Sequence, residues 1–307
     1  MKISNKEKTS SKAGKKFSLA GKEAEAWLLI APLLFLVVLL IWYPQIMSFF
    51  WSMCDMQGYT PTAFVGLKNY KSILSNTMFV KILLNTLKYV FWSLVIGYIL
   101  PLIVAIMMNE MVHFKSGFKT LIYFPHVLPG VAVSLMWYLM YFPDEGGMLN
   151  MILAIFGAKP MEWLQNEALT IPLIIISTTW KAMPGGMLMY YATLQGVNRD
   201  LYEAATIDGA GVLRRLWSIT LPQISGTMLL MLINQIIGIF QILEQPMAMT
   251  GGGPNNASIS LVYWSYKQGF ENFRVGPAMA IGNIVFAILI IMTIFYFKLN
   301  KKIEANN

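Results

Sequence analysis

The chain has 307 residues, of which 56% are apolar and only 12% are charged, about half the charged fraction of an ordinary soluble domain. The apolar residues form long runs, which exclude a soluble globular domain because they need a hydrocarbon solvent. The formal net charge is +8. Its surplus lies mostly before the first apolar run, a placement typical of a cytoplasmic retention signal and not of a surface that binds nucleic acid.

The residue types that carry most catalytic and metal chemistry are scarce. Cys54 is the only cysteine, so no disulfide can form within the chain. The two histidines, His113 and His126, lack the HExxH spacing, and each adjoins the end of an apolar run. We therefore predict no catalytic residue and no metal site.

The chain begins with a basic tail, residues 1–25, which is rich in Lys and Ser. The first apolar run extends from Trp27 to about Phe50, which is too long for the 7–15-residue core of a secretory signal. No small-residue cleavage site closes this run. We expect it to remain as a membrane anchor.

Six apolar runs are long enough to cross a bilayer, at roughly 20 residues each. They lie near residues 26–50, 82–109, 120–142, 170–195, 219–243 and 277–299. Pro125 and Pro129 interrupt the third run, which a spanning helix tolerates where its neighbours satisfy the freed carbonyls. The sequence thus predicts an all-α polytopic membrane protein, with a transmembrane domain over residues 26–300 and a cytoplasmic tail over residues 301–307.

The basic residues predict the orientation. They concentrate in the amino-terminal tail, the loops 110–119 and 196–218, and the carboxyl terminus, whereas loop 143–169 has four acidic residues against Lys159 alone. Segment 51–81, with three lysines and one aspartate, is an exception. By the positive-inside rule, both termini and loop 196–218 should face the cytoplasm.

The loop between the fourth and fifth runs predicts a short surface helix. Asp200 and Glu203 have the spacing of a capping box. The helix should continue to Ile207, because Gly209 suits the left-handed residue that ends a helix.

The same stretch matches the EAA motif of bacterial ABC importer permeases, in both halves and in the internal spacing. Its two adjacent alanines give the helix a flat face for close packing. The matching residues are Glu203, Ala204, Ala205, Asp208, Gly209, Ala210, Ile219, Leu221 and Pro222.

Nearly the whole chain resembles the maltose-type, or carbohydrate-uptake, permease family. The stretches that carry this resemblance are Ala31-Pro32, Tyr43-Pro44, Val65–Tyr70, Asn85-Thr86, Leu194-Gln195 and Met249–Pro254. The family's larger member carries extra N-terminal helices and a large external domain, and by resemblance we expect this chain to be one of the shorter six-span members without them. The resemblance implies a type I ABC importer transmembrane domain in a bacterial cell membrane, with a coupling helix in the EAA loop.

The resemblance also implies partners and a substrate class. The partners are a second permease subunit in a heterodimer, two ATPase subunits, an external solute-binding protein and membrane lipid, with no nucleic acid. The chain has no G-x-x-x-x-G-K-[ST] motif, so ATP and Mg are expected on the partner ATPase and not on this chain. The expected substrate is an oligosaccharide or a related sugar or polyol.

Two other classes fit the sequence less well. An ion-coupled secondary transporter would need acidic residues within its spans, whereas Glu110 and Glu244 lie near span ends. A membrane-embedded enzyme would need a convergent set of acids or metal ligands inside the membrane.

Amide side chains in the fifth run are candidates for the substrate path. Asn234, Gly238 and Gln241 are spaced to share one helical face, which continues to Gln245. Amides are costly in lipid, so this face should look at a water-filled path or at another subunit, and both interpretations stand. Asn283 in the sixth run is a further candidate.

Trp180 in the fourth run also has two interpretations. Its ring can stack on the C–H face of a sugar, or it can belong to the aromatic belt of the membrane interface. Farther along, Gly251–Gly253 permits a flexible external loop. These glycines either contact a binding protein or make a turn.

Overall fold

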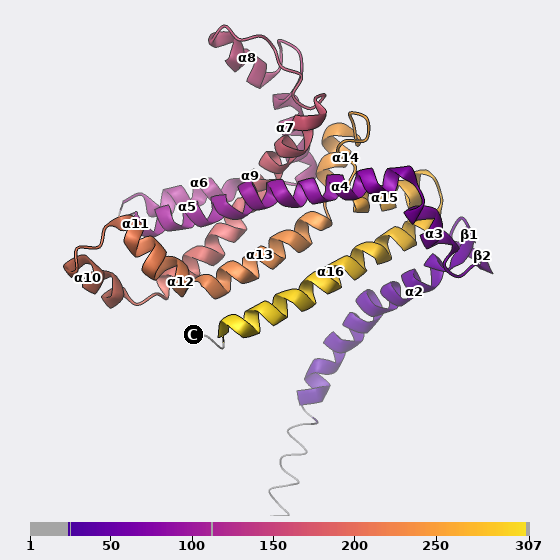
Figure 1. The fold of residues 1–307 in the computed structure, drawn as a ribbon, viewed down its shortest axis with the longest axis horizontal. Coiled ribbons are helices and arrows are strands. Elements are labelled where there is room, and N and C mark those ends of the chain that lie inside the picture. The colour runs from indigo at the N-terminus through magenta and orange to yellow at the C-terminus, as the bar shows by residue number, and fades with distance from the viewer. Residues whose placement is uncertain (1–23, 25, 112, 305–307) are drawn as a thin grey trace, which may run out of the picture. The chain divides into compact units, whose positions relative to one another are not determined.

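The computed structural model describes residues 24, 26–111 and 113–304 (Figure 1). Apart from Ala24, the basic tail predicted over residues 1–25 lies outside the described residues, as do residues 305–307. Contacts divide the chain into one unit that ends at Trp51 and a second that begins at Ser52. Each unit is described by itself.

The first unit is a single apolar helix. It belongs to the continuous helix Ala26–Ser52, which includes η1 (Val38–Trp42) and α2 (Tyr43–Ser52). Its most apolar stretch has no buried residue. Apolar side chains on all sides are typical of a helix surrounded by lipid, as expected for the first predicted run.

The second unit opens with a feature that was not predicted, an antiparallel hairpin of β1 (Cys54–Gln57) and β2 (Thr60–Phe64). Helix α3 (Lys68–Leu74) follows it. The buried Asn69 side chain donates its Nδ2 to the carbonyls of Ser52 and Cys54, each at 2.9 Å. This amide ties α3 to the start of the hairpin.

Two further continuous helices are long and apolar enough to cross a membrane. One covers Thr77–Glu110 and consists of α4 (Thr77–Trp92), η2 (Ser93–Tyr98) and α5 (Ile99–Glu110). The other lies within α16 (Val275–Glu304). Helix α16 extends five residues beyond position 299, where the predicted sixth run ends, so most of the predicted tail 301–307 is helical where it is described.

Helix α9 (Glu167–Gln195) covers the fourth predicted run and is the central helix of the second unit. It packs against α4, η2, α5 and α13, and it contributes buried residues to two hydrophobic clusters, among them Ile174 and Met187. Although α9 has 29 residues, it is not among the three most apolar long helices. A helix covered by its neighbours needs fewer apolar side chains than one that faces lipid.

The third and fifth predicted runs are bent, not straight. Helices α6 (Lys115–Val127) and α7 (Gly130–Met140) meet at 98°. Pro129 follows Leu128, which is extended with φ −69° and ψ 142°, as expected for a residue that precedes proline.

The fifth run is bent by 72° where α11 (Val212–Arg215), η3 (Leu216–Thr220) and α12 (Leu221–Gln223) lead into α13 (Ser225–Phe240). The described residues contain up to five spans if each bent pair counts as one. The number of six membrane spans stays a prediction.

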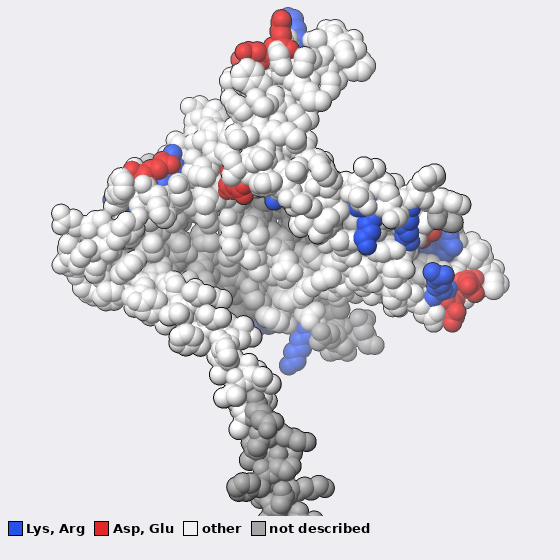
Figure 2. Space-filling view, turned by 180° about the vertical axis from the view of Figure 1, so that it is seen from behind, with Lys and Arg blue, Asp and Glu red and all other residues white. Residues whose placement is uncertain are grey.

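On the face shown in Figure 2, charged side chains form separate small groups, and broad areas between these groups carry none. A surface without charge is what hydrocarbon requires.

Asn150 organises the segment that follows α7 and contains α8 (Met148–Ile155). Its Nδ2 lies within hydrogen-bond distance of four carbonyl oxygens, those of Phe142, Pro143, Asp144 and Met161. Its Oδ1 accepts from the Met161 N–H at 3.0 Å and from Trp163 Nε1 at 2.8 Å. One buried amide thus joins the start of this segment, residues 142–144, to its end, residues 161–163.

Replacing Asn150 by Leu should therefore open this segment locally. The change removes the acceptor of the part-buried Met161 N–H and Trp163 Nε1, at about 0.5–1.5 kcal/mol per lost hydrogen bond, so we expect hydrogen exchange across residues 142–164 to rise by roughly tenfold. Exchange in α9 should stay unchanged. The control is Met151→Leu at an exposed position of the same helix, and equal exchange in both variants would contradict the prediction.

Candidate functional site

Helix α10 (Arg199–Ile207) lies where the surface helix was predicted, but its cap is a different residue. Asn198 precedes the helix, and its Oδ1 accepts from the Asp200 N–H at 3.0 Å. The cap predicted at Asp200 is therefore wrong. Asp200 instead lies in the first turn, where a negative charge still favours the helix, and Glu203 is an exposed residue outside any capping box.

The predicted end of α10 is confirmed. Gly209 has φ +74°. The N–H of Ala210 donates to the Ala205 carbonyl at 2.8 Å and that of Gly209 to the Thr206 carbonyl at 3.1 Å. This pair of bonds is a Schellman motif, which needs a left-handed residue at C′, the first position after the C-cap, and therefore favours glycine there.

Despite both caps, none of the nine residues of α10 is buried. In Figure 1 the helix lies at the far end of the second unit, beyond α11 and α12. Two side-chain bonds fix it, from Tyr202 Oη to Thr220 Oγ1 and from Arg215 Nη1 to Thr206 Oγ1, both at 3.0 Å.

The residues of the EAA motif are open to the surroundings. Ala205, Ala210, Ile219 and Leu221 are half-buried, and the exposed members are Glu203, Ala204, Asp208, Gly209 and Pro222. Large apolar side chains beside them are also exposed, among them Ile207 at 87% and Trp217 at 70%. A cluster of this kind on one surface is typical of a docking site.

A small polar cavity of about 180 Å³ lies among η2, α9 and α13. Its polar lining consists of the side chains of Ser93, Thr178, Thr179, Asn234 and Gln235.

The lining hydroxyls and amides differ in their bonding. Ser93 Oγ and Thr178 Oγ1 donate to carbonyls of their own helices. Among the described residues, the amides of Asn234 and Gln235 have no hydrogen-bond partner. Free amides and hydroxyl oxygens in one cavity can bond the hydroxyl groups of a solute.

The amide stripe predicted along the fifth run is only partly correct. Asn234 borders the cavity, and Gly238 lies one turn farther along the exposed face of α13. The helix ends at Phe240, so Gln241 is its C-cap residue and Gln245 belongs to α14 (Glu244–Thr250). These glutamines therefore do not continue the face of α13.

Gln235 borders the cavity but was not predicted. The sequence pattern used to predict the path selects polar residues that share one face of a helix. Asn234 and Gln235 are adjacent in the sequence and do not share a face, so the pattern selects the first and misses the second. The available signal was two adjacent amides in an apolar run.

Two other predicted path residues lie outside the cavity. Half-buried Trp180 packs edge-on against Trp137, with ring centroids 6.0 Å apart. Asn283 is buried, and its Nδ2 donates to Tyr70 Oη at 3.2 Å, which joins α16 to α3. This contact gives Asn283 a packing role.

The glycines of the loop after α14 permit flexibility, but the structure holds this loop in place. Helix α4 supplies three donors to its backbone. Lys81 Nζ donates to Asn255 O at 2.6 Å, Asn85 Nδ2 to Asn256 O at 2.8 Å, and Tyr89 Oη to Ser258 O at 3.0 Å.

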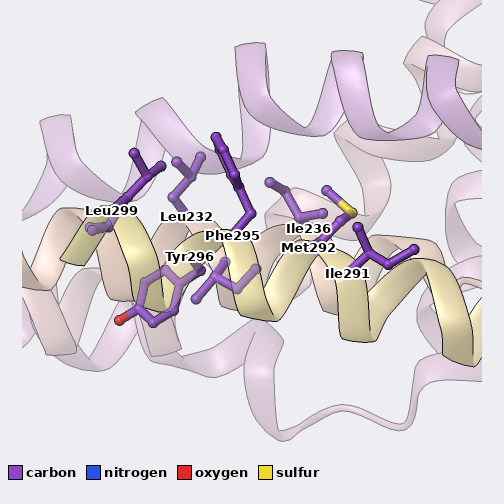
Figure 3. Close-up of a pocket in the computed structure, with 9 residues that line it drawn as sticks. Leu232, Ile236, Ile291, Met292, Phe295, Tyr296 and Leu299 are labelled. Carbon is purple, nitrogen blue, oxygen red and sulfur yellow. The ribbon is translucent and has the colours of Figure 1, made fainter. Parts of the chain in front are cut away.

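An apolar groove of about 370 Å³ lies between α13 and α16 and is lined by Leu, Ile, Met, Phe and Tyr (Figure 3). This groove has almost no hydrogen-bonding groups for a sugar, and its apolar lining suits the hydrocarbon chains of lipid. Within the part of the chain that the structure describes, no group of three His, Cys, Asp or Glu residues could hold a metal ion.

Comparison with known proteins identifies the family. Residues 97–305 match the family model described as "Binding-protein-dependent transport system inner membrane component". The arabinooligosaccharides transport system permease protein AraP of Bacillus subtilis is 31% identical, with 91% of this chain and 89% of that protein covered. The trehalose/maltose permease MalF of Thermococcus litoralis is 33% identical, with 90% and 93% covered. The sn-glycerol-3-phosphate permease UgpA of Escherichia coli O157:H7 is 28% identical, with 89% and 92% covered.

A solved structure shares the fold. It is a chain of the bacterial alginate ABC transporter in complex with an alginate pentasaccharide-bound periplasmic protein, with a TM-score of 0.83, 21% identity, and 94% of this chain and 97% of that chain covered. From the family match over residues 97–305 and the extent of its likeness to MalF, the chain belongs to the inner membrane components of binding-protein-dependent transport systems.

Proposed function

We propose that the chain is one permease subunit of an ATP-driven importer, and that α10 is the element through which separate ATPase subunits drive it. One observation carries this proposal: α10 is capped at both ends, yet none of its nine residues is buried. Helices this short gain most of their stability from packing. A capped helix with no buried residue, flanked by exposed apolar side chains, lacks the packing surface that a partner protein would supply.

The sequence supports an energy source on separate subunits. The chain has no phosphate-binding loop, so ATP and Mg bind to two ATPase subunits, one beneath each permease. The chain itself carries out no catalysis.

The solute is an oligosaccharide or a related sugar or polyol. Relatives named for arabinooligosaccharides and for trehalose and maltose support this class. The cavity supports a neutral solute over a phosphorylated one, since no Lys or Arg is among its lining residues, and cations usually bind phosphate. A volume of about 180 Å³ is small for an oligosaccharide, so a second, different permease supplies the other half of the path.

An external solute-binding protein delivers the substrate, and the structured loop 251–260 is the surface offered to it. The name of the matching family and the periplasmic protein in the alginate transporter complex support this partner. Membrane lipid covers the uncharged surface.

Both termini and α10 face the cytoplasm in this proposal. Helix α10 and the carboxyl-terminal end of α16 lie toward the same end of the second unit (Figure 1). This end carries exposed cations, namely Arg199, Arg214, Lys298 and Lys301, as the positive-inside rule requires of a cytoplasmic face.

Cysteine labelling tests this orientation. In a Cys54→Ser background, Arg199→Cys should resist a membrane-impermeant thiol reagent in intact cells and react after the cells are opened. Lys159→Cys, also exposed and predicted to lie outside, is the matched control and should react in both. Labelling at position 199 in intact cells would refute the topology.

The cavity proposal predicts a transport defect without an assembly defect. Asn234→Leu and Gln235→Leu each remove one amide that can bond a solute hydroxyl, at about 0.5–1.5 kcal/mol. We expect each to slow transport roughly two- to tenfold, measured in proteoliposomes with saturating binding protein. Ile237→Leu, on the same helix outside the cavity, should leave the rate unchanged. Wild-type rates in both amide variants would remove the cavity from the path.

Coupling is tested at the end of α10. A β-branched residue is strained in the left-handed conformation by about 1–2 kcal/mol, too little to unfold the protein but enough to misplace a docking helix. Gly209→Val should therefore weaken ATPase association or raise the ATP hydrolysed per solute transported. Gly211 has an ordinary φ of −67°, and a Cβ added there would meet no atom within 4 Å, so Gly211→Val is the matched control. Normal coupling in both Gly209→Val and Glu203→Lys would end the proposal.

A further inference from the structure

A carboxylate lies directly against the backbone at the break in the third run. A methyl group added to Gly130, the first residue of α7, would overlap both carboxylate oxygens of Glu244. Glu244 is half-buried and begins α14. Figure 1 shows α14 beside α7, and the contacts between these two helices agree with the view.

This carboxylate has no cation beside it. Among the residues that the structure describes, the one ion pair within 4.0 Å joins Lys267 to Glu271. What Glu244 meets instead is the start of α7. The Val133 N–H donates to the Pro129 carbonyl at 3.1 Å, and this is the first backbone hydrogen bond of helical type at the start of α7.

The start of α7 is therefore electropositive. The N–H groups of residues 130–132 precede that first bond and have no acceptor within the helix. The positive end of a helix favours a carboxylate beside it.

Both helices follow a break in the chain. Helix α7 is joined to α6 through Leu128 and Pro129 alone, at a bend of 98°. Helix α14 is joined to α13 through the three residues 241–243. Neither α7 nor α14 is therefore held to the preceding helix by a continuous helical backbone.

We propose that the contact between Glu244 and Gly130 makes α7 and α14 a single moving body in the transport cycle. Gly130 is required because any side chain there would displace the carboxylate. Glu244 is required because its charge holds the start of α7. The inference rests on the proposed transport function, since a moving body has a role only if the path opens and closes.

The test is a double-variant cycle measured on the assembled transporter in two ways. Gly130→Ala should lower the midpoint temperature of thermal unfolding and raise the ATP hydrolysed per solute transported several-fold. Glu244→Ser should do the same more mildly. If the added methyl acts only through the carboxylate, Gly130→Ala combined with Glu244→Ser should be no worse than Glu244→Ser alone. Defects in the double variant that equal the sum of both single ones would overturn the proposal.

Two controls separate the causes. Gly226→Ala, where nothing lies close to the added methyl, should behave as wild type. Glu244→Gln keeps the shape of the side chain without its charge and should resemble Glu244→Ser, whereas wild-type behaviour would show that the charge is not used. An unchanged ATP-to-solute ratio in Gly130→Ala would reduce the contact to packing and overturn its role in motion. The unfolding cycle needs neither solute nor ATP, so it holds or fails independently of the proposed transport activity.

Discussion

A peptide group that enters hydrocarbon must find its hydrogen-bond partner inside the protein, and the arrangement of this chain depends on that constraint. It explains why the helices are long and why the interruptions occur among neighbouring helices. Pro125 is buried just before the bend of the third run, and Ile242 is buried in the link between α13 and α14. Helix α9, packed against most of the others, provides the surface against which broken helices keep their place.

Much of the fold could be predicted because hydropathy reports directly on lipid contact. The apolar runs became helices, and the surface helix ends where Asp208 and Gly209 indicated. The bends could not be predicted from the same signal. Proline shows that a helix is weakened at position 129, but the angle of 98° depends on what packs against each half. The prediction of the residue that caps α10 was wrong for a related reason. Asn198 and Asp200 can both cap a helix, and which of them does so depends on where the preceding helix α9 ends.

The candidate site was harder to predict than the fold. Asn234 was found because an amide is conspicuous in an apolar run, yet its neighbour Gln235 was missed. The stripe to Gln241 and Gln245 assumed a helix that in fact ends at Phe240. Asn283 looked like a path residue because its partner, Tyr70, is far away in the sequence. Periodicity describes one helix at a time, whereas a polar residue in a membrane protein is explained by the helix it faces.

The loop 251–260 shows what a few donors from a neighbouring helix can change. Three glycines and two asparagines would leave an isolated peptide many conformations, and selecting one of them upon association would cost entropy. Lys81, Asn85 and Tyr89 have already selected one during folding. A partner that meets this surface thus meets a shape that is already set, so little of its binding free energy is lost in ordering the loop.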